Sequence, residues 1–68
     1  MNAITLDLIE AGSFFRCAIG LLCRTCTCRG DEICCLRVSQ GEFGPVVQHK
    51  IEIWLSASTE VTLTEVSS

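Results

Sequence analysis

The chain has 68 residues, six of them cysteine, a formal net charge of −3 and a mean hydropathy of +0.44. This length allows one domain, and the acidic balance argues against nucleic-acid binding, which draws most of its affinity from phosphate neutralisation. No apolar run approaches the ~20 residues of a membrane-spanning helix, and the first residues carry an acid but no positive charge, unlike a secretion signal. We therefore expect a single cysteine-rich domain, residues 1–68, that is intracellular or held in a particle released by lysis.

The first half of the chain predicts one strand and one short helix. Residues 4–8 alternate between apolar and polar side chains, the pattern of a half-buried strand. Residues 14–22 follow Ser13, a residue that caps helices, and carry apolar side chains near helical spacing, although Gly20 lies among them. Residues 25–31 are turn-like and contain Gly30.

The second half predicts three strands, at residues 34–38, 46–55 and 61–64, and the last two read as a hairpin. In the middle strand, Ile51, Ile53 and Leu55 should face one way and Glu52 and Trp54 the other. The expected fold is mainly β: a small antiparallel meander, sandwich or open barrel of about four strands with at most one short helix. Such a sheet has edges, and these carry few protective charges, so we expect pairing with another copy or another protein.

The cysteines include a set that could bind zinc. Cys23 and Cys26 form a C-x2-C pair that Cys28 follows closely, and such turns present thiolates to one ion. Cys34 would complete the site, with Cys35 or His49 as its substitute. No second C-x2-C pair is present, and adjacent residues on a strand point to opposite faces, so only one of the vicinal pair can join easily. Buried or disulfide-bonded cysteines are the competing interpretation, and no cofactor is required.

Two short resemblances involve the same cysteines. Cys17-x5-Cys23-x2-Cys26 resembles the clustered ligands of vertebrate-type [2Fe-2S] ferredoxins, which would imply iron–sulfur electron transfer, but the fourth ligand of those longer domains lies much further along the chain. Cys23-x2-Cys26-x-Cys28 is similar to the metal claw of nitrile hydratase alpha subunits, over six residues only. A redox role for the C-x2-C pair would need a βαβ context, which this antiparallel pattern lacks.

Arg29-Gly30-Asp31 resembles the integrin-binding loop of disintegrins. Disintegrins are secreted and richer in cysteine, and Gly-Asp is an ordinary turn sequence. We therefore interpret Gly30-Asp31 as a turn and do not expect integrin binding.

No residue pattern indicates catalysis. His49 is the only histidine, without a serine or carboxylate partner at a defined spacing, and no glycine-rich phosphate loop is present. We therefore predict that the protein is not an enzyme and has no catalytic residues.

The large side chains instead indicate an interface. A 68-residue chain with this many apolar residues cannot bury them all, and exposed apolar surface marks contact sites. The predicted interface residues are Trp54, Phe14, Phe15 and Phe43.

Three hypotheses follow. The first is a non-enzymatic structural or interaction subunit of a larger or homo-oligomeric assembly, such as a component of a viral or phage particle, stabilised by its cysteines. The second is a zinc-binding regulatory module, and the third is a small redox or iron–sulfur electron-transfer protein.

Overall fold

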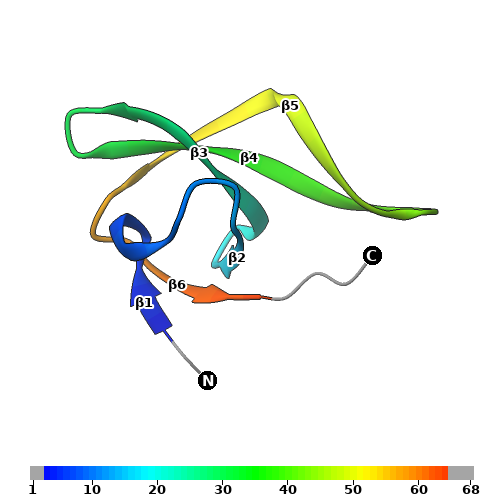
Figure 1. Ribbon diagram of the computed structural model, residues 1–68, viewed down its shortest axis with the longest axis horizontal. Helices are drawn as coiled ribbons and strands as arrows, with labels where there is room; N and C mark the ends of the chain where they lie inside the picture. The colour runs from blue at the N-terminus through cyan, green and yellow to red at the C-terminus, as the bar shows by residue number, and fades with distance from the viewer. Residues whose placement is uncertain (1–2, 65–68) are drawn as a thin grey trace.

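The structure, a computed structural model, describes residues 3–64 as one antiparallel sheet with strand order β1-β6-β2-β3-β4-β5 (Figure 1). The elements are β1 (Ala3–Thr5), the 3-10 helix η1 (Leu6–Leu8), β2 (Phe14–Cys17), β3 (Gly20–Arg29), β4 (Glu32–Gly41), β5 (Gly44–Ser56) and β6 (Glu60–Leu63). The mainly β class is therefore confirmed. The expected count of about four strands is wrong, because the sheet has six.

The helix predicted over residues 14–22 is wrong, because this segment forms the β2–β3 hairpin. Phe15 pairs with Leu22, and Cys17 pairs with Gly20 at the turn. Gly20 has a φ of +121°, a conformation that glycine adopts without steric cost. Phe14 and Phe15 point to opposite faces of the strand and enter two different apolar clusters, so both faces of this strand are apolar.

Strand β3 continues through most of the segment predicted as a turn. Only Gly30 and Asp31, between β3 and β4, form the turn, which confirms the interpretation of that dipeptide. The β3–β4 register shifts between Arg24 and Cys28, so this part of β3 is irregular. Residues 25–28 therefore lie in a distorted strand.

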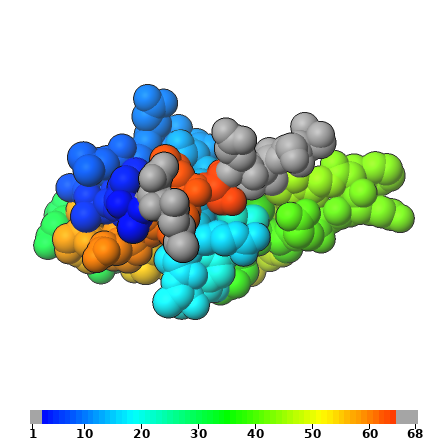
Figure 2. All heavy atoms as spheres, turned by 90° about the horizontal axis from the view of Figure 1, so that it is seen from below, coloured from blue at the N-terminus to red at the C-terminus, as the bar shows by residue number. Residues whose placement is uncertain are grey.

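The β4–β5 hairpin ends in a protruding arm. We define the arm as residues 37–48, in which Arg37 pairs with Gln48 and Gly41 pairs with Gly44 around the turn residues Glu42 and Phe43. The arm extends away from the other strands in Figure 1 and forms the yellow-green projection in Figure 2. Its tip is therefore remote from the core.

Strand β5 bends where the arm begins. Leu36 pairs with Glu52, whereas the next β4 residue, Arg37, pairs with Gln48, so residues 49–51 have no partner in β4. This gap coincides with the sharp bend of β5 in Figure 1. The two halves of β5 thus belong to two separate stretches of ladder.

The predicted hairpin between the last two strands is wrong. Strand β6 pairs with β1 through Ile4–Val61 and with β2 through Phe15–Leu63, whereas β5 pairs with β4. This topology leaves β1 and β5 as the two edges of the sheet. Strand β1 is short because the chain turns into η1, where the Leu6 N–H donates to the Thr59 carbonyl at 2.9 Å. The strand predicted at residues 4–8 is therefore correct only at its start.

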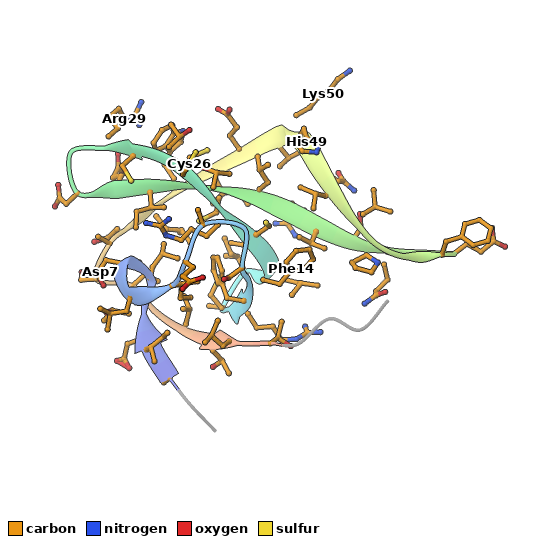
Figure 3. The ribbon with its side chains drawn as sticks, viewed as in Figure 1. Asp7, Phe14, Cys26, Arg29, His49 and Lys50 are labelled. Carbon is orange, nitrogen blue, oxygen red and sulfur yellow. The ribbon has the colours of Figure 1, made fainter. Side chains whose placement is uncertain are left out.

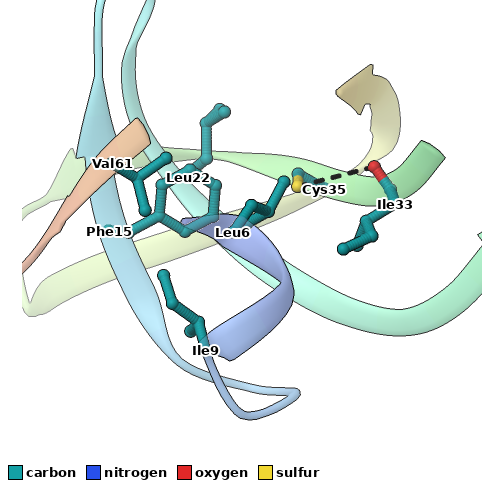
Figure 4. Close-up of a cluster of buried hydrophobic side chains, with 7 residues drawn as sticks. All are labelled: Leu6, Ile9, Phe15, Leu22, Ile33, Cys35 and Val61. Atoms are coloured by element: carbon teal, nitrogen blue, oxygen red, sulfur yellow. Dashed lines mark hydrogen bonds between the residues drawn. The ribbon is translucent and has the colours of Figure 1, made fainter. Parts of the chain in front are cut away.

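The core consists of two clusters. The main cluster contains Leu6, Ile9, Phe15, Leu22, Ile33, Cys35 and Val61 (Figure 4). The second contains Leu21, Cys23 and Val38, against which Phe14 and Val47 pack. The sheet therefore buries apolar side chains on both faces, which is unusual for an antiparallel sheet and explains its high hydropathy.

Candidate functional site

The six cysteines do not form one cluster. All are free thiols: Cys26 and Cys28 are exposed, Cys17 is half-buried, and Cys23, Cys34 and Cys35 are buried. Both members of the vicinal pair, Cys34 and Cys35, are buried, although adjacent residues of β4 point to opposite faces. Apolar side chains on both faces of the sheet account for this.

The predicted zinc ligands are not brought together. Cys23 packs in the second cluster, Cys26 and Cys28 face outward on β3, and Cys34 is buried on β4. His49 is exposed at the bend of β5 (Figure 3). Within residues 3–64, no three histidine, cysteine or acidic side chains are grouped so that they could hold a metal. No observation therefore favours the zinc module over the other hypotheses.

Burial makes the inner cysteines poor nucleophiles. Cys35 is fully buried, and its Sγ donates to the Ile33 carbonyl at 3.7 Å (Figure 4). Desolvation, assisted by Cys34 and Cys17 and opposed by Arg24, raises the pKa of Cys35 to about 11. Burial also raises the pKa of Cys23. Because the thiolate is the reactive form, neither residue supplies a nucleophile at neutral pH.

We expect thiol modification to follow this order of burial. In the folded protein, iodoacetamide should label Cys26 and Cys28 first, and Cys23, Cys34 and Cys35 only after unfolding in guanidinium. Peptide mass spectrometry of time points gives the rate at each position, and a Cys26→Ser/Cys28→Ser variant should lose the fast phase. Rapid labelling of Cys35 in the folded chain would contradict the packing.

Arg29 and Trp54 contact each other within the chain. The guanidinium carbon lies 4.3 Å from the centre of the indole ring, and Nη2 of Arg29 lies 3.3 Å from a carboxylate oxygen of Glu32. A cation over an indole face is attracted by the ring quadrupole. Trp54, a predicted interface residue, is therefore half-buried beneath Arg29. Arg29, the first residue of the Arg-Gly-Asp triplet, is the last residue of β3.

The three phenylalanines have three different environments. Phe15 is 0% exposed in the main cluster, and Phe14 is half-buried in the second. Phe43 is 97% exposed at the tip of the arm. Of the predicted interface residues, Phe43 thus has its whole side chain available, whereas Phe15 has no accessible surface to offer.

Other exposed apolar residues went unrecognised in the sequence. Leu8 in η1, Val46 on the arm and Ile51 at the bend of β5 are all exposed. The Gly41–Gly44 spacing around Glu42-Phe43 is a signal that could have identified the hairpin tip, because two-residue turns flanked by glycine join antiparallel strands. No comparable local signal marks Leu8. Ile51 was expected on the same face as Ile53 and Leu55, but it is exposed because residues 49–51 leave the β4–β5 ladder.

A shallow cavity of about 310 Å³ lies on the surface, lined in part by Arg16, Cys17 and Glu60. These residues are on β2 and β6, and His49 is not among the residues that line the cavity. Among the described residues, no polar or charged residue is classed as buried. We assign no reaction to this cavity.

Comparison with known proteins gives no match to a family model, a curated protein or a solved structure. Within residues 3–64, no helix is long and apolar enough to cross a bilayer.

Proposed function

We propose that this protein is a non-enzymatic interaction subunit of a larger or homo-oligomeric assembly, and that the β4–β5 arm is its docking element. The observation that carries the proposal is Phe43, 97% exposed at the end of a hairpin that projects from the sheet. An aromatic side chain at a protruding tip can enter a pocket of a partner, and such anchors supply much of the binding energy of interfaces.

The arm is preorganised for docking. Five backbone pairs, from Arg37–Gln48 to Gly41–Gly44, hold its strands together, and the Gln48 side-chain amide donates to the Ser39 hydroxyl. A structured element loses less conformational entropy on binding than a free loop. Burying the Phe43 side chain would contribute about 1.5–3 kcal/mol, enough to alter the dissociation constant ten-fold or more.

The rest of the molecule suits a repeated subunit. Within residues 3–64 both edges of the sheet lack a neighbouring strand, and Val46 is a second exposed apolar residue on the arm. Cys23 and Cys35 serve as small apolar side chains in the two clusters. A viral or phage particle is one setting in which many copies of so small a chain would be used.

We expect the purified chain to self-associate in a concentration-dependent manner, and Phe43→Ser to weaken that association ten-fold or more. Sedimentation velocity over a wide concentration range, in reducing buffer, measures the dissociation constant. The matched control is Leu8→Ser, which removes a 72% exposed apolar side chain away from the arm and should leave the dissociation constant unchanged.

Two results would overturn the proposal. Equal dissociation constants for the Phe43→Ser variant and the wild type would remove the arm from the interface. A wild-type chain that stays monomeric at every concentration would argue against an assembly of this chain altogether.

A further inference from the structure

The bend of β5 presents a piece of strand that the sheet does not use. Residues 49–51 have no partner in β4, and β5 is an edge strand, so within residues 3–64 no other strand pairs with them. Residues 49–52 are all exposed, with Ile51 at 41%. Figure 3 shows His49 and Lys50 at this bend, with Lys50 pointing away from the protein. On its outer side β5 has no neighbouring strand among the described residues, and the free backbone groups of such an edge can pair with another strand.

The charges around Ile51 are complementary to themselves. Lys50 and Glu52 flank this residue with opposite signs. When two antiparallel strands pair with Ile51 opposite its own copy, each Lys50 lies opposite the partner's Glu52. Opposite charges directly across an antiparallel pair are stabilising, and like charges are destabilising.

We infer that a second copy of this chain pairs with β5 about a two-fold axis at Ile51, with two reciprocal Lys50–Glu52 pairs. The inference rests on the proposed assembly function and names the occupant of one of its surfaces. A two-fold contact is isologous, so it needs a patch that matches itself, and the Lys50-Ile51-Glu52 sequence has that property.

The other edge is a weaker candidate for this role. Strand β1 has only three residues, because the chain enters η1 directly after Thr5. Strand β5 has 13 residues, and no other strand of the described part of the chain lies along its outer edge. Backbone pairing supplies affinity while the side chains set the register. The charges at 50 and 52 therefore select the register centred on Ile51.

The test is a charge-swap experiment on the full chain. Lys50→Glu and Glu52→Lys each replace both attractive pairs of the dimer with repulsive ones, so each should weaken dimerisation by roughly ten-fold. The double variant Lys50→Glu/Glu52→Lys restores opposite charges across the axis and should return the dissociation constant to within about two-fold of wild type. Sedimentation velocity at low ionic strength measures all four proteins, and added salt should narrow their differences.

Matched controls separate the position of a charge from the net charge. Glu10→Lys and Arg16→Glu make the same charge changes at exposed positions outside β5, and they should leave dimerisation unchanged. The series is repeated in the Phe43→Ser background. A dimer that persists there and still obeys the charge swap supports the β5 contact even if the arm proposal fails.

Two outcomes would overturn the proposed β5 contact. Association that depends on Phe43 but not on residues 50 and 52 overturns the β5 contact and leaves the arm as the interface. Weakening in both single variants without recovery in the double variant shows that the two charges face something other than each other, and it also overturns the inference.

Discussion

Phe15→Ala should lower the free energy of unfolding by about 3–5 kcal/mol. Phe15 is the largest of the fully buried side chains and lies in the main cluster, where Leu22 is its partner across the β2–β3 ladder. Its removal leaves a cavity lined by residues from several elements, and these elements cannot all move inward. The cost is therefore the lost transfer energy together with the lost packing contacts.

Phe43→Ala is a matched control for this prediction. It deletes the same atoms at a position that is 97% exposed, so it should change stability by less than about 0.5 kcal/mol. Urea titration followed by the fluorescence of Trp54, the only tryptophan, gives both values. Equal losses for the two variants would contradict the position of Phe15 in the core.

The size of the chain makes the Phe15 variant a severe one. Globular domains have a net stability of roughly 0.05–0.15 kcal/mol per residue, so a chain of this length has only a few kcal/mol in reserve. We therefore expect Phe15→Ala to be substantially unfolded at 37 °C, whereas Phe43→Ala keeps a cooperative transition. Stabilisation of the variant by low concentrations of an osmolyte would recover a measurable transition.

The strands that were correctly predicted are those with a simple two-residue period. Residues 34–38 and 46–55 alternate, and they form parts of β4 and β5 as expected. Ile53 and Leu55 pack against the main cluster, while Trp54 contacts Arg29. The local pattern was sufficient here because, in these segments, the face of the strand on which a residue lies decides whether its side chain is apolar or polar.

The helix prediction over residues 14–22 failed for the converse reason. Phe14 and Phe15 are both apolar although they lie on opposite faces, because each face of β2 meets its own cluster. Where both faces are apolar, the two-residue period disappears, and the remaining pattern fits a helix about as well. Gly20 was the better guide, because its positive φ closes the β2–β3 turn.

The pairing of β6 could not be predicted locally. A short connection after β5 favours a hairpin, yet β6 crosses to pair with β1 and β2, which lie more than 40 residues earlier in the chain. The backbone bonds from Leu6 and Asp7 to Thr59 and Ala57 support that crossing. Such long-range contacts depend on the whole sheet, and nothing in residues 56–64 specifies them.

The candidate site was predictable only in kind. Exposed aromatic surface and free sheet edges were expected from composition, but not which residues provide them. Phe43 became the candidate because the register places it at a hairpin tip, and Ile51 because three residues of β5 lack a partner. The zinc prediction assumed that cysteines close in sequence are close in space, whereas strand alternation and the irregular part of β3 separate them.

Raising the pH from 9 to 11 should lower the free energy of unfolding by roughly 2 kcal/mol through Cys35. Its pKa is about 11 in the folded chain against an ordinary value of 9.0. Because folding raises this pKa, the contribution of Cys35 to the free energy of unfolding is fully present below pH 9 and is lost as the pH rises through 11. Between these two values the unfolded chain releases the Cys35 proton more readily than the folded chain does. One pKa unit corresponds to about 1.4 kcal/mol.

The composition of the chain makes this alkaline window easy to interpret. The chain has no tyrosine, and its only lysine, Lys50, is exposed. Urea titrations at several pH values, under reducing conditions, give the slope, and Cys35→Ala should remove most of it. The raised pKa of Cys23 acts in the same direction and leaves a smaller residual slope in that variant. A free energy of unfolding that stays constant from pH 9 to 11 in the wild type would contradict this prediction. It would mean that water solvates the Cys35 thiolate in the folded chain, whereas the structure buries Cys35 completely in the main cluster.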